Sequence, residues 1–172
     1  MAISLYDVSV GSMLQTVGAV SAFVEKGRAW CAEASVNPEE VVETRLASDM
    51  FPFRFQLLSV VHHSIHAIEG ARAGVFGPPA PMDLDYAGLQ AHVADALSRL
   101  RALSADEVNA LEGRDVVFKL GSSQIPFTAE GFLMSFSLPN LHFHAATAYD
   151  ILRQKGAPLG KRDYLGALKI RA

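Results

Sequence analysis

The segment AEGFLMSFSLPNLHFHAATAYDILRQ, residues 129–154, carries the clearest structural signal in this chain of 172 residues. Apolar residues recur in it at every third or fourth position, which is the pattern of an amphipathic helix. At 1.5 Å per residue, such a helix is about 40 Å long. Pro139 should kink it, because proline cannot donate a backbone hydrogen bond and leaves a carbonyl one turn earlier without a partner.

Polar side chains interrupt the apolar part of this segment and mark the first place to look for a functional site. Helix cores usually exclude such groups, since a buried polar atom without a partner costs roughly 1–3 kcal/mol. Asn140 and His144 are four residues apart and share one face of the helix. His142 lies about 200° away from His144, so it should be more exposed and cannot chelate the same metal ion. The predicted inward stripe contains Phe136, Asn140, Phe143, Thr147 and Ile151.

Apolar periodicity also predicts three earlier long helices, at residues 5–34, 48–74 and 86–103. Asn37 and Pro38 are typical of the start of a short additional helix, as cap and first helical residue. Ser48 or Asp49 is expected to cap the second long helix.

The remaining segments predict a loop and a hairpin. Residues 74–85 contain two glycines and three prolines, which indicates a loop. Residues 114–128 hold two β-prone runs on either side of Gly121-Ser122-Ser123, which predicts a small β-hairpin that must lie against the helices. We therefore predict an all-α chain, a single domain over residues 1–172, built as a four-helix bundle with a β-hairpin before the last helix.

Composition limits the classes of function. A formal net charge of -3 gives no basic footprint for nucleic acid, so no nucleic-acid partner is expected. The single cysteine, Cys31, cannot form an internal disulfide and is expected to be a buried, inert thiol. We find no secretory signal and no run of about 18 apolar residues, so a soluble cytoplasmic protein without membrane contact is expected.

Three histidines lie on the second predicted helix. Relative to its inward stripe, His66 points outward and His63 nearly so, whereas His62 lies at the margin. His62 and His66 have the spacing of a ligand pair but face away from the interior. His63, His66 and His92 are therefore predicted to be surface groups, and His144 to be either a core histidine with a hydrogen-bond partner or a pocket residue.

Other candidate site residues are weaker. Asp49 fits a helix cap better than a site residue, and Gln56 suits a hydrogen bond between helices as well as a site. Tyr149 and Arg153 are four residues apart and fit packing and capping. A zinc or nickel site needs three or four converging ligands, and the inward set offers His144 with only weak donors such as Asn140, Asp49 or Gln56. No phosphate loop, nucleophile elbow or HExxH motif occurs.

The chain resembles a group of bacterial and fungal proteins known only as a domain of unknown function, within the DinB/YfiT-like superfamily of four-helix bundles. The resemblance covers nearly the whole chain and is densest near the C-terminus. It rests on Ser4-Leu5-Tyr6-Asp7, on Leu46-Ala47-Ser48-Asp49-Met50-Phe51-Pro52 with Gln56, on Leu138-Pro139-Asn140, Phe143-His144 and Thr147-Ala148-Tyr149-Asp150-Ile151-Leu152-Arg153, and on Gly156 and Gly160-Lys161-Arg162-Asp163-Tyr164-Leu165-Gly166.

The resemblance implies an up-down-down-up bundle. Many DinB-like proteins bind a divalent metal through three histidines, one on the second helix and two on the fourth, and some are thiol-dependent transferases or isomerases. His144 matches the second ligand of the fourth helix, but Asn140 stands in the place of the first, and no histidine of the second helix matches cleanly. The three-histidine pattern is therefore incomplete, and the cofactor is left open.

Three functions follow from these observations. The first is a small-molecule pocket lined by Asn140 and His144, with Asp49, Gln56, His62 and Tyr149 as contributors; in an enzyme, His144 would be the general acid or base, assisted by Asn140 and Tyr149. The second is a non-catalytic homodimer or structural protein in which Asn140 and His144 form a hydrogen-bond network. The third is a divalent-metal-dependent transferase.

Overall fold

The computed structural model describes residues 3–171. The first predicted helix is present as α1 (Leu5–Val8) and α2 (Val10–Glu33), which meet at Ser9. The short helix α3 (Pro38–Val42) follows, and the Asn37 side chain accepts a hydrogen bond from the backbone N–H of Glu39 at 3.1 Å. The predicted cap and the predicted first helical proline are thus confirmed.

The second long helix consists of α4 (Phe53–Val61), the π-helical segment η1 (His62–His66) and α5 (Ala67–Ala73). The prediction that Ser48 or Asp49 caps it is wrong, because the helix begins at Phe53 after Pro52. A start at residue 49 would require Phe51 to be helical, and the residue before a proline disfavours that conformation. Gly74 ends the helix with φ 74°, a left-handed conformation that favours glycine.

The third long helix is α6 (Tyr86–Arg101), and the Asp85 side chain caps it by accepting from the N–H of Gly88 at 2.7 Å. The short helix α7 (Ala105–Asn109) follows. Ser104 and Glu107 form a reciprocal capping box at its start, as the sequence indicates.

A three-stranded sheet lies at one end of the bundle, in the order β1-β2-β3. The predicted hairpin is confirmed as β2 (Asp115–Leu120) and β3 (Ser123–Thr128), which are antiparallel. Residues 74–85 are not entirely a loop, because β1 (Val75–Phe76) pairs with β2 in parallel. Pro126 is tolerated because β3 is an edge strand. The chain is therefore mostly helical with a small sheet, rather than strictly all-α.

The last long helix is composed of α8 (Ala129–Gly131), the π-helical segment η2 (Phe132–Ser137) and α9 (Leu138–Lys155); a short α10 (Lys161–Leu165) follows. Pro139 occupies the first turn of α9, directly after η2. The backbone is helical through Ser137 and Leu138, so the helix continues across the proline, and the π-helical segment η2 lies where the sequence predicts a kink.

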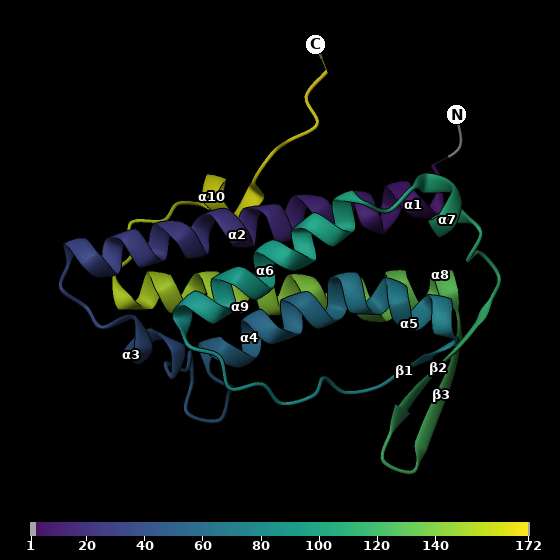
Figure 1. Ribbon diagram of the computed structural model, residues 1–172, viewed down its shortest axis with the longest axis horizontal. Helices are drawn as coiled ribbons and strands as arrows, with labels where there is room; N and C mark the ends of the chain where they lie inside the picture. Colours follow the sequence, from purple (N-terminus) through teal and green to yellow (C-terminus); the bar gives the residue numbers. More distant parts are fainter. Residues whose placement is uncertain (1–2, 172) are drawn as a thin grey trace.

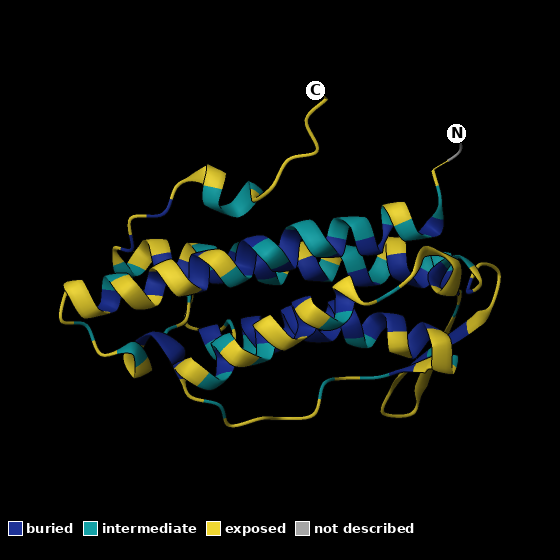
Figure 2. Cartoon of the chain, turned by 45° about the horizontal axis from the view of Figure 1, so that its top comes forward, coloured by how far each residue is buried: buried dark blue, intermediate teal, exposed yellow. Residues whose placement is uncertain are grey.

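The long helices form a four-membered bundle in which α2 contacts α6 and α9, and α4 contacts the same two helices. Figure 1 shows residues 77–85 running along the outside of the bundle from the sheet to the start of α6, so that α4–α5 and α6 run in the same direction. Buried residues line the facing sides of the helices (Figure 2). The fully buried Tyr86 joins two of them, since its hydroxyl donates to the backbone carbonyl of Val24 at 2.8 Å.

One helix, over Leu5–Glu33, is long and apolar enough to cross a membrane by length and composition. Half of its most apolar window is buried inside the bundle, as in the core helix of many bundles. Cys31 also lies on this helix and is buried, and burial raises the pKa of its thiol.

Candidate functional site

The centre of the candidate site is a hydrogen bond between α4 and α9. Nδ1 of His144 lies 2.7 Å from Oε1 of Gln56, although the two residues are 88 positions apart. Gln56 is only 2% exposed, and its Nε2 donates to the backbone carbonyl of Phe51 at 2.8 Å. The Gln56 side chain is thus held at both ends of its amide, and the position of His144 is fixed by a rigid partner.

This arrangement determines the tautomer of His144. A backbone carbonyl can only accept a hydrogen bond, so the amide nitrogen of Gln56 must face Phe51 and its oxygen must face the imidazole. Nδ1 of His144 therefore carries the proton, and Nε2 of the neutral ring has a free lone pair. Among residues 3–171, Nε2 has no hydrogen-bond partner.

The ring of His144 is neutral at pH 7. Burial lowers its pKa from 6.5 to about 4, because the charged form loses solvation between the helices. His144 is only half-buried, and it contacts the aromatic rings of Phe55 and Phe143 edge to face, with centroid distances of 5.8 and 5.3 Å. The structure presents an unprotonated nitrogen beside an aromatic surface.

The prediction that His63 lies on the surface is wrong. His63 is only 8% exposed and stacks parallel to His144, with ring centroids 5.9 Å apart and planes 10° apart. Two features explain the difference: the π-helical turn at His62–His66 changes the direction of the side chains, and Phe76 of β1 and Phe136 of the last helix cover His63. Nδ1 of His63 is buried without a hydrogen-bond partner among the described residues.

His62 is also buried rather than marginal. It stacks on Phe76 at 4.2 Å, and its Nε2 lies 2.8 Å from the carbonyl oxygen of Gly77. Burial lowers the pKa of His62 to about 4 and that of His63 to about 3. His66 and His92 are half-buried, and their ring centroids lie 6.3 Å apart. The sequence run HHSIH indicates the cluster, but Phe76, which covers both His62 and His63, comes from β1, and no sequence signal predicts that strand.

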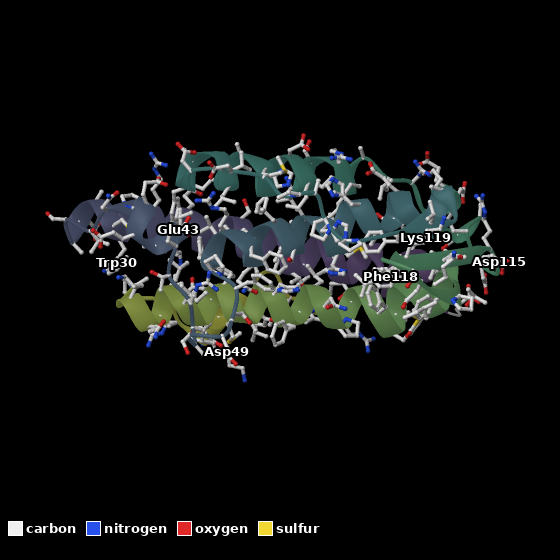
Figure 3. The ribbon with its side chains drawn as sticks, turned by 90° about the horizontal axis from the view of Figure 1, so that it is seen from below. Trp30, Glu43, Asp49, Asp115, Phe118 and Lys119 are labelled. Carbon is white, nitrogen blue, oxygen red and sulfur yellow. The ribbon has the colours of Figure 1, made fainter. Side chains whose placement is uncertain are left out.

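The other predicted site residues lie elsewhere. The amide of Asn140, which is half-buried, donates to the carbonyl of Phe136 on its own helix at 2.7 Å. Asp49 is exposed in the turn before α4, and Figure 3 shows it at the outer margin of the molecule. Tyr149 packs against Phe23 and Tyr164, with ring centroids 6.0 and 5.9 Å apart. The structure therefore brings together His144 and Gln56, and neither Asp49 nor Tyr149 contributes to this hydrogen bond.

The predicted inward stripe of the last helix is partly wrong. Thr147 and Ile151 are buried, but Phe143 is 57% exposed, because the buried face of α9 is formed by Leu141, Ala145, Ala148 and Leu152. Phe143 was expected in the core because it is apolar, but the buried stripe combines two leucines with two alanines.

The side chains do not fit the three-histidine metal site that the resemblance implies. Among residues 3–171, no group of three or more His, Cys, Asp or Glu side chains is arranged to hold a metal ion. Asn140, which stands in the place of the first ligand of the fourth helix, donates its amide to the carbonyl of Phe136, so His144 has no second ligand one turn before it. Among the histidines of the described residues, His63 and His144 are the one pair whose rings stack between the second and fourth long helices.

The bundle and its histidine cluster define a DinB-like helical protein. A solved structure of a DinB family member from Shewanella denitrificans is similar, with a TM-score of 0.80 and 25% sequence identity, covering 98% of this chain and 95% of that one. Residues 5–165 match the family described as a domain of unknown function, DUF1993, so the chain belongs to that family. No curated protein matches the chain. The predicted resemblance is confirmed.

Proposed function

We propose that this DinB-like protein binds a small molecule at the seam between α4 and α9, with His144 as the polar group that recognises it. The observation that carries the proposal is the fixed tautomer of His144: Gln56 holds Nδ1–H, and Nε2 is left as a free acceptor. A neutral imidazole in this state can accept a proton or a hydrogen bond at pH 7. In an enzyme, it would be the general base.

The surroundings of His144 support binding of a ligand with an apolar part. Phe51 is 60% exposed and stacks on Phe55 at 4.2 Å, and Phe143 is 57% exposed beside the imidazole. Aromatic faces around a directed polar group are typical of sites that orient small molecules. Asn140 supports the site indirectly, because its amide donates a hydrogen bond to the carbonyl of Phe136 within η2.

A metabolite screen tests this proposal. The wild-type protein and the His144→Phe variant are screened for ligand-induced thermal shifts and for turnover, with Tyr149→Phe as the control on the same helix. We expect hits that disappear in His144→Phe and persist in Tyr149→Phe. Full binding and full activity of His144→Phe would refute a role of His144 in recognition.

A non-catalytic homodimer is the alternative, and the exposed Phe51 and Phe143 are the observation that favours it. In this case the Gln56–His144 bond stabilises the packing of α4 on α9, and the aromatic surface is covered by a second copy. Sedimentation velocity separates the two functions: a strict monomer that binds metabolites contradicts the homodimer.

We further infer the up-down-down-up order of the long helices, supported by the path of residues 77–85 (Figure 1). We also infer a cytoplasmic protein without nucleic-acid or membrane partners. The net charge of -3 gives no basic footprint for nucleic acid, and the helix that is apolar enough to cross a membrane is half buried inside the bundle. A divalent-metal-dependent transferase is the least supported alternative, since the described residues do not form the three-histidine site.

A further inference from the structure

A pocket of about 450 Å³ is lined by His62 but not by His144. Its walls come from α4, η1, α5, β1 and α6, and from residues 77–82, which we call the strap. Figure 1 shows this part of the chain passing along the outside of α4 and α5. The volume falls within the range of about 300–1,000 Å³ that is typical of small-molecule sites.

The walls of this strap pocket are mainly apolar. They are formed by Leu58, Val75, Phe76, Pro78, Pro79 and Met82, among others. Four polar side chains also line it: His62, His66, Glu69 and His92. An apolar cavity with a few directed polar groups is the usual composition of a ligand site.

The floor of the strap pocket is rigid. His62 donates from Nε2 to the carbonyl of Gly77 at 2.8 Å, because a carbonyl can only accept, and it stacks on Phe76 at 4.2 Å. Nδ1 of the neutral ring is therefore an acceptor. Gly70 lets β1 approach α5 closely, since a Cβ at this position would lie 2.7 Å from the ring of Phe76. His62 and Gly70 thus fix the position of Phe76, which forms the floor of the pocket below the strap.

The strap pocket offers no net charge to a ligand. Within residues 3–171, no lysine or arginine lines it, and its one carboxylate, Glu69, is paired with Arg99. Burial lowers the pKa of His62 to about 4 and also lowers the pKa values of His66 and His92, so these imidazoles are neutral at pH 7. A charged ligand would lose its hydration without gaining a partner of opposite charge.

We propose that the strap pocket is a second binding site, separate from His144, for an uncharged aromatic molecule with a hydrogen-bond donor. Phe76, Met82 and the prolines of the strap contact its rings, and the imidazoles accept from its donor group. This site does not depend on the function proposed for His144, because His144 does not line it.

A matched pair of fluorescent probes tests the proposal. N-phenyl-1-naphthylamine is uncharged and has one N–H donor, and 8-anilino-1-naphthalenesulfonate is the same skeleton with a sulfonate. Each is titrated into the full chain at pH 7. We expect saturable binding of the uncharged probe, with affinity at least about tenfold higher than that of the sulfonate, which corresponds to about 1.4 kcal/mol.

Two tryptophan variants locate the binding. Ala73 lines the pocket and is exposed at the last position of α5, so Ala73→Trp should block the pocket without disturbing the core, and we expect a loss of affinity of at least about tenfold. Ala32 is exposed in the last turn of α2 and is not among the pocket residues, so Ala32→Trp is the control and should bind like the wild type. Ala73→Leu provides a second, smaller obstruction, and circular dichroism verifies that each variant is folded.

Four results would overturn the proposal. Absence of saturable binding of the uncharged probe would show that there is no site of this class. Equal losses in Ala73→Trp and Ala32→Trp, or no loss in the folded Ala73 variants, would place the probe elsewhere. Binding of the sulfonate as tight as that of the uncharged probe would refute the ligand class.

Discussion

Replacement of His63 by phenylalanine should stabilise the protein more at pH 5 than at pH 7. Burial, with a smaller contribution from His62, lowers the pKa of His63 in the folded protein from 6.5 to about 3. The folded state therefore binds fewer protons than the unfolded state below pH 6.5. The contribution of His63 to the free energy of unfolding is therefore constant above about pH 6.5 and decreases as the pH falls from 6.5 toward 3.

The magnitude follows from the two pKa values. At pH 5 the unfolded imidazole is protonated and the folded one is not, which costs about 2 kcal/mol relative to pH 7. Phenylalanine does not titrate, so the free energy of unfolding gained by His63→Phe should be about 2 kcal/mol larger at pH 5. Any change in packing is the same at both pH values and cancels in this difference. Removal of the unpartnered Nδ1 adds roughly 1–3 kcal/mol at either pH.

Urea unfolding followed by circular dichroism at pH 5 and pH 7 measures both free energies. His142→Phe, at an exposed position on α9, is the control: burial also lowers the pKa of His142, but this side chain is more exposed than His63, so we expect a smaller pH-dependent difference. A difference for His63→Phe below about 0.5 kcal/mol would mean that His63 is not held neutral in the folded state, and the account of the histidine cluster would fail.

Three further predictions concern the same structure. His144→Phe should lower the free energy of unfolding by about 1–2 kcal/mol, because Gln56, which is 2% exposed, loses its hydrogen-bond partner. Adding Gln56→Leu in the same chain should recover part of this loss, and additive effects in the double-mutant cycle would contradict the Gln56–His144 bond. Gly27→Ala should destabilise the folded state by about 1–3 kcal/mol in thermal unfolding, since its Cβ would lie 2.8 Å from the hydroxyl of Tyr86. Gly18→Ala in the same helix is the control: its Cβ would meet nothing within 4 Å, and the variant should be more stable by up to about 1 kcal/mol. Elemental analysis of protein purified without an affinity tag should show no stoichiometric Zn, Ni, Fe or Mn. One equivalent of any of them would contradict the conclusion that the side chains around Asn140 and His144 do not fit a metal site.

Much of the fold was predictable because its signals are local. Apolar periodicity predicts the long helices, and Asn37, Ser104 and Gly156 mark helix ends by the hydrogen bonds that they make. Pro52 also gave a local signal, and the rule for residues before proline would have corrected the predicted start of α4.

The candidate site was less predictable because its contacts are not local. β1 has only two residues, and its partner Val117 is about 40 positions away, so no local pattern reveals the pairing. The burial of His62 and His63 depends on that pairing and on a π-helical turn. A helical wheel assumes 100° per residue and cannot anticipate either feature.

The most direct test of the central claim is the protonation state of the His144 ring, measured by long-range nitrogen–proton correlation NMR between pH 5 and pH 8. We predict a single neutral tautomer with the proton on Nδ1 and a bare Nε2 throughout this range, because Gln56 fixes Nδ1 and burial lowers the pKa to about 4. A proton on Nε2, or a titration midpoint near 6.5, would contradict it.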